Sequence, residues 1–262
     1  MPFSAAHPAA VLPLRRYCPG VFVWSALLIG SLTPDLECFL ELRPVARHGL
    51  TFAGSLYFCL PAGLVLYVLW HSVIKRPATL LLPDTWRAVV WPVVERPMVL
   101  ELRSLGAVVI SILVGTWLHQ AWDSFTHSNS LGVLTVPFLS TSLATFDSYD
   151  LTIFRLLQHV SSVVGMTFLT VAAVRWKKRA TPGPAPALSE SVRIAAISLI
   201  VFAPGLLGAL RAISHAAPYD GISYAKQFAA FGIITAISLG ALVLLFVAAT
   251  VHLFRGRLVE EP

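Results

Sequence analysis

The chain has 262 residues, of which 56% are hydrophobic and 12% charged, and its formal net charge is +6 at pH 7. A soluble globular domain carries about twice that charged fraction, so the composition excludes an ordinary soluble enzyme and predicts an integral membrane protein. The basic residues lie near the ends of apolar runs and do not alternate with aromatic residues, so nothing here supports nucleic-acid binding.

The chain opens with two short apolar segments. Residues 5–16 contain Pro8 and Pro13 and end at Arg15 and Arg16. At about 1.5 Å per residue this segment is too short to cross a membrane, and the next one, Val21–Leu32, is also short. We therefore expect a half-crossing hairpin. The alternative is a tight first span formed by Val21–Leu32 alone.

Five longer apolar runs predict five full membrane spans. Pro61 predicts a kink in the first span. Between the first two spans, residues 75–103 contain tryptophans, prolines and several basic residues, which is typical of an interfacial loop or surface helix. Residues 124–152 predict a long polar loop. The spans are expected at Gly49–Ile74, Leu105–Trp122, Ile153–Trp176, Val192–Ile213 and Gln227–Phe254.

The fold class predicted is an all-α, polytopic helical membrane bundle with about five spans and a short N-terminal hairpin. We expect a membrane domain over residues 1–179, a linker rich in proline and alanine over 180–191, and a two-span hairpin over 192–262. Three cysteines, with no CxxC spacing and no even count, predict neither disulfides nor a thiolate zinc site; these are Cys18, Cys38 and Cys59.

The distribution of basic residues predicts an orientation. Residues 75–103, the stretch Arg175–Arg179 and the tail with Arg255 and Arg257 fall on one side, which the positive-inside rule makes cytoplasmic. The C-terminus is then cytoplasmic, and residues 33–48 and 124–152 lie at the outer face. A hairpin at the N-terminus returns His7 to that same outer face.

The stretch GTWLHQAWDSFTH at the end of the second span carries the strongest chemical signal. It places His119, Asp123 and His127 at i, i+4 and i+8, which share one face of an α-helix. Imidazole and carboxylate groups in this spacing can bind a divalent metal. The alternative is a helix end with ordinary hydrogen-bonding histidines. The outer face supplies six candidate ligands in all: His7, Asp35, His48, His119, Asp123 and His127.

Further candidates surround this set. Glu37 and Asp123 are predicted as catalytic residues. Glu37 could act as a general base, and the alternatives are a further metal ligand or a hydrogen-bond partner that orients a histidine ligand. His159 is an additional candidate ligand or substrate contact. Asp35 could instead cap the next helix. His71 and His252 are expected to be interfacial.

The motifs AAHPAAVLPL, GSLTPDLECFL, HQAWDSFTH and LLQHVSSVVG resemble a bacterial membrane family described as domain of unknown function 4184. More distantly, the pattern of histidines and aspartates is similar to membrane-bound metal-dependent hydrolases and zinc-dependent phospholipase C. That resemblance implies the six ligands above and a bacterial inner-membrane location. The chain lacks one histidine of this pattern after His48, and it also lacks the later His-x-x-x-Glu pair. We therefore expect one or two divalent ions, with zinc as the first candidate.

These observations predict a membrane-embedded metal-dependent hydrolase of a phosphoester or lipid-linked substrate, with membrane lipids as its surroundings. A non-catalytic, metal-stabilised scaffold or partner-binding protein is the alternative. A transporter is a third hypothesis. It is disfavoured because the sequence has no inverted repeat and few ionisable groups at mid-membrane. The sequence does not indicate the oligomeric state.

Overall fold

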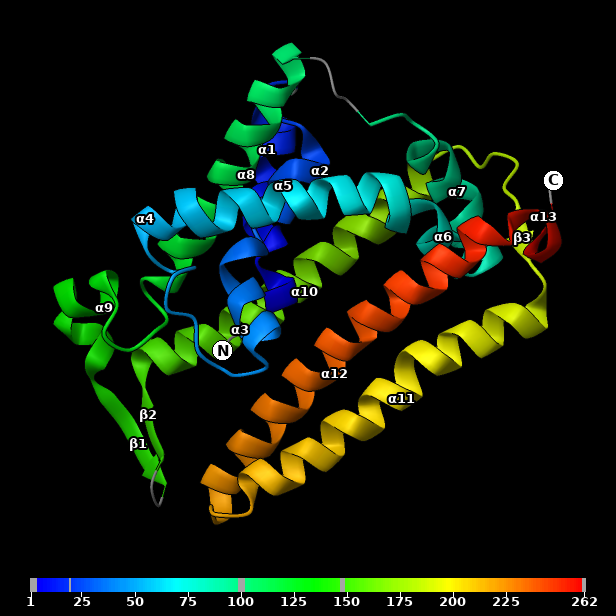
Figure 1. The fold of residues 1–262 in the computed structure, drawn as a ribbon. Coiled ribbons are helices and arrows are strands. Elements are labelled where there is room, and N and C mark those ends of the chain that lie inside the picture. The colour runs from blue at the N-terminus through cyan, green and yellow to red at the C-terminus, as the bar shows by residue number, and fades with distance from the viewer. Residues whose placement is uncertain (1–3, 19, 99–101, 147–148, 261–262) are drawn as a thin grey trace.

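The computed structural model describes residues 4–18, 20–98, 102–146 and 149–260. Five helical runs are long and apolar enough to cross a membrane, which confirms the predicted all-α architecture (Figure 1). Large apolar side chains such as Val163, Phe202 and Phe246 point outward from these runs, as lipid-facing residues do. The runs are Phe52–Leu80, Ser104–Asp123, Ile153–Arg179, Glu190–Ala216 and Gly221–Leu253.

The first run is one helix with two changes of pitch. It consists of α4 (Phe52–Gly54), the π-helix η3 (Ser55–Cys59), α5 (Leu60–Leu69), the π-helix η4 (Trp70–Ile74) and α6 (Lys75–Leu80). Pro61 and Pro77 follow the two π-helical turns, and proline leaves the carbonyl four residues earlier without its helical donor. For Pro77 that carbonyl belongs to Val73, and it accepts a hydrogen bond from His252 Nε2 at 3.0 Å.

Two short helices form the N-terminal hairpin. After the 3-10 turn η1 (Ser4–Ala6), α1 (Pro8–Tyr17) and α2 (Trp24–Gly30) pack against each other and against the longer helices. Both are too short to span, as predicted. The 3-10 turn η2 (Thr33–Asp35) and α3 (Leu36–Glu41) follow.

Helix α8 (Leu102–Asp123) packs closely on α2, and glycines make this approach feasible. A Cβ placed on Gly30 would lie 2.1 Å from the carbonyl oxygen of Ile112, and one on Gly115 would lie 2.3 Å from that of Leu27. Backbone contacts this close require residues without a side chain. This close packing on α2 holds the C-terminal half of α8 in place.

Residues 124–152 are more ordered than a polar loop. They contain the short helix α9 (Leu131–Thr135), the 3-10 turn η5 (Pro137–Ser140) and an antiparallel hairpin of β1 (Ser142–Phe146) and β2 (Tyr149–Thr152). Burial of Val133, Leu139 and Phe154 anchors this segment on α10 (Ile153–Arg179). This hairpin was not predicted, because its strands of five and four residues are too short to show a clear alternating pattern.

The opposite end of the molecule carries most of the basic segments. Helix α7 (Asp84–Val94) covers this end beside α6, as expected for an interfacial helix (Figure 1). The short helix α13 (Arg255–Leu258) is followed by β4 (Val259–Glu260), which pairs with β3 (Ala187–Leu188). This strand pairing joins the segment 180–189 to the last described residues of the chain.

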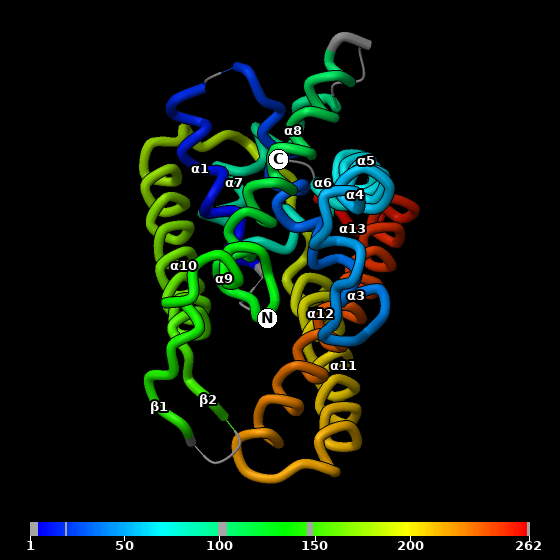
Figure 2. Tube along the Cα trace, turned by 90° about the vertical axis from the view of Figure 1, so that its left-hand side faces the viewer, coloured from blue at the N-terminus to red at the C-terminus, as the bar shows by residue number. Residues whose placement is uncertain are grey.

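Helices α11 (Glu190–Ala216) and α12 (Gly221–Leu253) form an antiparallel hairpin along the molecule. Figure 2 shows the turn of this hairpin lying beside the β1–β2 hairpin. The three cysteines are free, as predicted.

Candidate metal centre

Three separate parts of the chain meet at the C-terminal end of α8. His119 and Asp123 lie one turn apart on that helix. His7 lies at the start of α1, which packs on α8, and Asp35 lies at the end of η2. All four side chains are buried. The desolvation cost of burying polar groups makes such a gathering rare unless the groups satisfy one another or bind a ligand.

His7, His119 and Asp123 form a compact group. His7 Nε2 lies 3.0 Å from Asp123 Oδ1, and His119 Nε2 lies 3.2 Å from Asp123 Oδ2. The two imidazole rings are stacked, with centroids 3.7 Å apart. One ligand atom from each of the three residues lies within 4.8 Å of the others, so this buried group could bind a metal ion.

The hydrogen bond of His119 decides which of its nitrogens faces the group. Its Nδ1 lies 2.8 Å from the carbonyl oxygen of Ser31, which can only accept, so Nδ1 carries the hydrogen. In the neutral ring, Nε2 then presents a lone pair to Asp123 Oδ2. Neither of these two atoms has a hydrogen-bond partner, nor does Oδ2 of Asp35. The two buried acceptors that face each other, His119 Nε2 and Asp123 Oδ2, are costly to bury without a proton or a cation between them.

The packing of α2 on α8 holds the carbonyl of Ser31 in position. The Thr33 and Thr116 hydroxyls lie 3.0 Å apart, and Thr116 also donates to the carbonyl oxygen of Gly30 at 3.2 Å. These bonds tie the end of α2 to α8 one turn before His119. In metal sites, a histidine ligand commonly donates its other ring N–H to a backbone carbonyl in this way, which fixes its tautomer.

Asp35 lies at the edge of the group. Its Oδ1 is 3.8 Å from His119 Nε2. Its side chain makes no capping hydrogen bond at the start of α3, so the alternative role as a helix cap is wrong. Among the described residues, the ion pairs of Asp35 and Asp123 involve histidines alone. Two buried carboxylates thus lack a lysine or arginine partner.

His127 reaches the group by a different route from the one predicted. Helix α8 ends at Asp123, so His127 belongs to the following turn and not to a third helical turn. The turn folds back, placing His127 Nδ1 3.4 Å from Asp123 Oδ2. Burial lowers the pKa of His127, although the nearby Asp123 carboxylate opposes this shift. Its side chain is 26% exposed, which gives the group contact with solvent.

Glu37 and His48 form a separate pair. Glu37 Oε1 lies 2.9 Å from His48 Nδ1, and Oε2 accepts the backbone N–H groups of residues 47–49 at 2.8–3.0 Å. Burial raises the pKa of Glu37, but the hydrogen bonds from Gly49, His48 and Arg47 outweigh it, and the net pKa is lowered. The structure therefore places His48 beside Glu37 and not in the group of His7, His119 and Asp123. The side chain of His48 is 54% exposed.

Helix α10 presents Gln158 to the centre and not the neighbouring His159. Gln158 Nε2 lies 3.3 Å from His127 Nε2, whereas the side chain of His159 is exposed. Adjacent helical residues point about 100° apart, so only one of the two can face the centre. The predicted candidate on this helix was His159, because the sequence carries no signal for the rotation of α10. Outside the centre, His71 contacts Ser25 at 2.9 Å.

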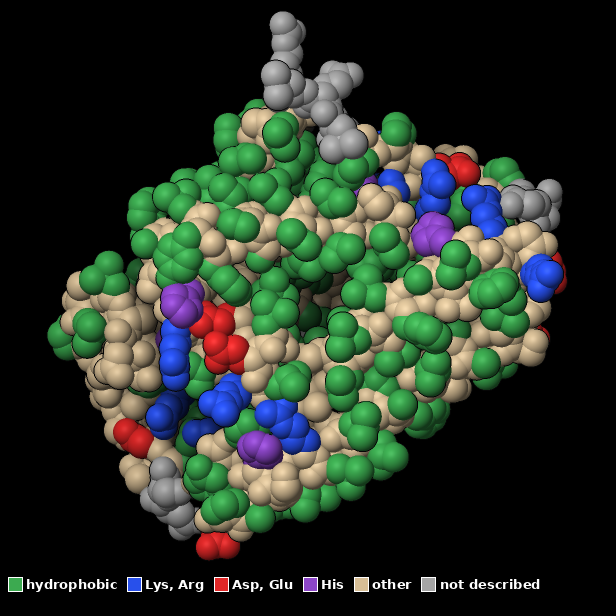
Figure 3. All heavy atoms as spheres, in the orientation of Figure 1, with side chains coloured by type: hydrophobic (Ala, Val, Ile, Leu, Met, Phe, Trp, Pro, Cys, Tyr) green, Lys and Arg blue, Asp and Glu red, His purple; other side chains and the backbone are tan. Residues whose placement is uncertain are grey.

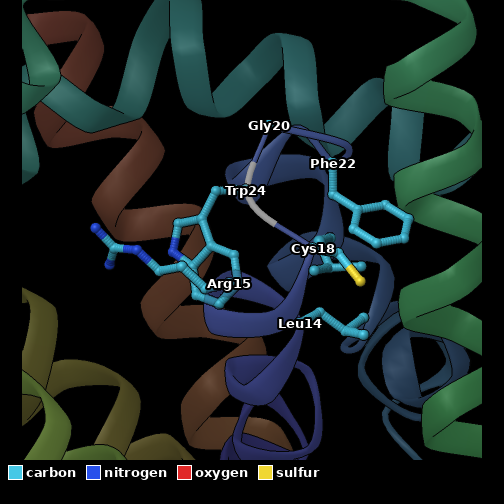
Figure 4. A pocket seen from close by; sticks show the side chains of 7 residues that line it. Leu14, Arg15, Cys18, Gly20, Phe22 and Trp24 are labelled. Carbon is cyan, nitrogen blue, oxygen red and sulfur yellow. The ribbon is translucent and has the colours of Figure 1, made fainter.

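A cavity of about 280 Å³ lies elsewhere, at the tip of the N-terminal hairpin. Figure 4 shows it lined by side chains from the end of α1 and the start of α2, among them Arg15, Cys18 and Trp24. Arg15 packs on the Trp24 ring, 5.5 Å from its centroid. His7 lies at the other end of α1, so this cavity is distinct from the metal centre.

The sequence matches the family model described as Domain of unknown function (DUF4184) over residues 1–251. The chain therefore belongs to that family, which confirms the resemblance found in its motifs. Neither the curated proteins nor the solved structures contain a match to this chain. The fold and the candidate metal centre are thus described from the geometry given above.

Proposed function

We propose that this member of the DUF4184 family is a membrane-embedded, metal-dependent hydrolase that acts on a phosphoester or lipid-linked substrate at the membrane surface. The observation that carries the proposal is the buried group of His7, His119 and Asp123, in which Nε2 of His119 and Oδ2 of Asp123 have no hydrogen-bond partner. The distant similarity of the histidine and aspartate pattern to membrane-bound hydrolases supports the reaction class.

The chemistry of the donor atoms fits a zinc-type ion. Two imidazole nitrogens and one carboxylate are a ligand set found in catalytic zinc sites. Asp35 and Asp123 are both buried, and their two carboxylates together match the charge of a divalent cation. His7, His119 and Asp123 would hold the ion. Asp35 and His127 lie within ion-pair distance of the same residues and would complete the set for one ion or contribute to a second.

The stack of His7 on His119 also favours a cation between the ligands over protonated rings. Two imidazolium rings with centroids 3.7 Å apart would repel each other in a buried place. Nε2 of His119 and Oδ2 of Asp123 both present lone pairs, so both atoms would be satisfied by a bound metal ion. When bound, such an ion lowers the pKa of a water toward neutrality and polarises a phosphoryl or carbonyl oxygen.

The remaining candidates receive supporting roles in this proposal. Glu37 remains proposed as a functional residue, but its contacts favour positioning: it orients His48 and holds residues 47–49. Gln158 orients His127 at the solvent-exposed side of the centre. The positive-inside rule supports an outer-face location for the centre and a cytoplasmic C-terminus.

A structural metal site is the second candidate function, and burial is the observation that favours it. His119 is 0% exposed and Asp123 is 3% exposed, so the ion would be nearly sealed from water. A closed site with four protein ligands stabilises a scaffold, whereas a site with three and an open position catalyses. The exposed edge of His127 favours the open, catalytic form.

Elemental analysis of the detergent-purified protein tests the proposal. The protein is purified without chelators, resupplied with zinc and compared with the His119→Ala/Asp123→Ala double variant. His215→Ala, at the exposed end of α11, is the matched control. We expect near-stoichiometric metal in the wild type and the control, and none in the double variant. No metal in the resupplied wild type would overturn the proposal.

A second measurement separates the two candidate functions. Zinc-loaded protein is assayed for release of nitrophenol from p-nitrophenyl phosphate esters and for hydrolysis of a short-chain phospholipid. Turnover that disappears in the double variant but persists in His215→Ala supports the hydrolase. Bound zinc with a raised melting temperature and no turnover supports the scaffold.

A further inference from the structure

Two cations share one aromatic ring where α10, α12 and the β hairpin meet. The guanidinium carbon of Arg155 lies 5.0 Å from the centroid of the Tyr149 ring, and Nζ of Lys226 lies 4.6 Å from it. Arg155 is in the first turn of α10, and Lys226 is near the start of α12. Tyrosine thus holds together two like charges that would otherwise repel each other.

Neither cation has an acidic partner among the described residues. Among the residues that the structure describes, every ion pair made by a lysine or arginine involves Asp84, which lies at the other end of the molecule. The nearest carboxylate in sequence to Arg155, that of Asp150, accepts instead from Ser142 and Thr145, and Arg155 bonds to its backbone carbonyl. Figure 3 shows Lys and Arg side chains gathered on the face between the β hairpin and the turn of α11 and α12.

Arg155 lies one helical turn before Gln158, a residue that contacts the edge of the candidate metal centre. Arg155 and Gln158 are three residues apart on α10, so their side chains lie on the same side of the helix. Gln158 in turn contacts His127, which contacts Asp123 of the centre. Arg155 and the candidate metal centre are therefore connected through the neighbouring side chains of Gln158 and His127.

We propose that Arg155 and Lys226 form a phosphate-binding subsite, which on the proposed function receives the phosphate of a phosphoester substrate. A guanidinium offers two parallel donors that match the geometry of a phosphate, and the ammonium adds a point charge. A dianion also removes the repulsion between the two cations. The subsite binds the phosphate of a lipid headgroup or free inorganic phosphate by the same contacts.

The test measures phosphate binding in the metal-free, full-length protein. The chelator-treated protein in detergent is titrated calorimetrically with dihexanoylphosphatidic acid and, separately, with inorganic phosphate. Arg155→Gln and Lys226→Gln each remove one cation. Arg155→Lys keeps the charge. Arg211→Gln is the matched control, because Arg211 belongs to the α11–α12 hairpin, as Lys226 does, but bonds to Thr235, farther along α12.

We expect Arg155→Gln and Lys226→Gln each to weaken binding about tenfold, the effect of losing roughly one charge-assisted hydrogen bond. Arg155→Lys retains most of the affinity, and Arg211→Gln binds as the wild type does. Binding of the lipid probe alone identifies a headgroup as the source of the phosphate, and binding of inorganic phosphate alone identifies the free ion.

Three results would overturn the subsite: neither probe binds, the two glutamine variants bind as tightly as the wild type, or Arg211→Gln weakens binding equally. Melting temperatures of all variants establish that each is folded. Because the titration is done without metal, it is independent of the proposed function. If the protein binds phosphate but no zinc, the subsite is supported and the proposed hydrolase function is refuted. If it binds zinc but no phosphate, the hydrolase function stands and the subsite is refuted.

Discussion

Replacing Asp123 by asparagine is expected to have opposite effects on stability with and without metal. The asparagine side chain would keep an acceptor for His7 at the position of Oδ1, now 3.0 Å from Nε2. Its amide N–H would face His119 Nε2, where the wild type sets two lone pairs 3.2 Å apart. Because satisfying a buried, unpaired polar group recovers about 1–3 kcal/mol, Asp123→Asn is expected to be neutral or stabilising in the metal-free protein.

The zinc-loaded protein should reverse this order. An ion present at 100 times its dissociation constant stabilises the folded state by about 2.7 kcal/mol, and the variant loses the anionic ligand that this binding requires. Thermal unfolding in detergent, with chelator and then with excess zinc, measures both effects. A loss of several kcal/mol in the chelated variant would refute the reasoning, because it would mean that the Asp123 carboxylate is paired with a protonated His119.

Three further predictions concern the surroundings of the centre. Glu37→Ala should destabilise the protein by about 3 kcal/mol, since three backbone donors lose a charged acceptor; a comparable loss in the exposed Glu41→Ala would contradict this. Because the pKa of Glu37 is lowered in the folded state, its contribution is complete above about pH 5 and is lost as the pH falls below its unfolded value near 4.3; melting temperatures between pH 3 and 7 should therefore show a smaller gap between wild type and Glu37→Ala at the acid end, and a constant gap would argue against it. Gly115→Ala should cost about 1–3 kcal/mol by pushing α8 from α2, whereas Gly106→Ala on the same helix meets no atom within 4 Å and should be neutral; equal melting temperatures for both variants would contradict the packing argument.

Local rules account for the parts of the fold that the sequence predicts well. The five spans follow from the length of the apolar runs, because a helix satisfies its own backbone in lipid whatever surrounds it. The first span continues beyond Ile74 to Leu80, since apolar composition alone does not show where a helix ends. The pairing of His119 with Asp123 follows equally from helical spacing. His127 did not follow it, because α8 ends at Asp123 and a turn brings the side chain back.

Contacts between distant segments decided the composition of the centre. His7 meets Asp123 across 116 positions, and only the packing of the N-terminal hairpin brings them together. Rotation of α10 selects Gln158 over His159, and the backbone of residues 47–49 keeps His48 with Glu37. These outcomes depend on how helices pack, and no spacing within one segment encodes that.

The sequence by itself therefore determined that this is a helical membrane protein of the DUF4184 family with metal-type ligands near one end of a span. Only the tertiary structure decided that His7, His119 and Asp123 share one buried place and that His119 presents a lone pair to it. The physical reason is that hydropathy and helical period act over a few turns, whereas a metal centre is assembled from side chains whose approach depends on the whole bundle.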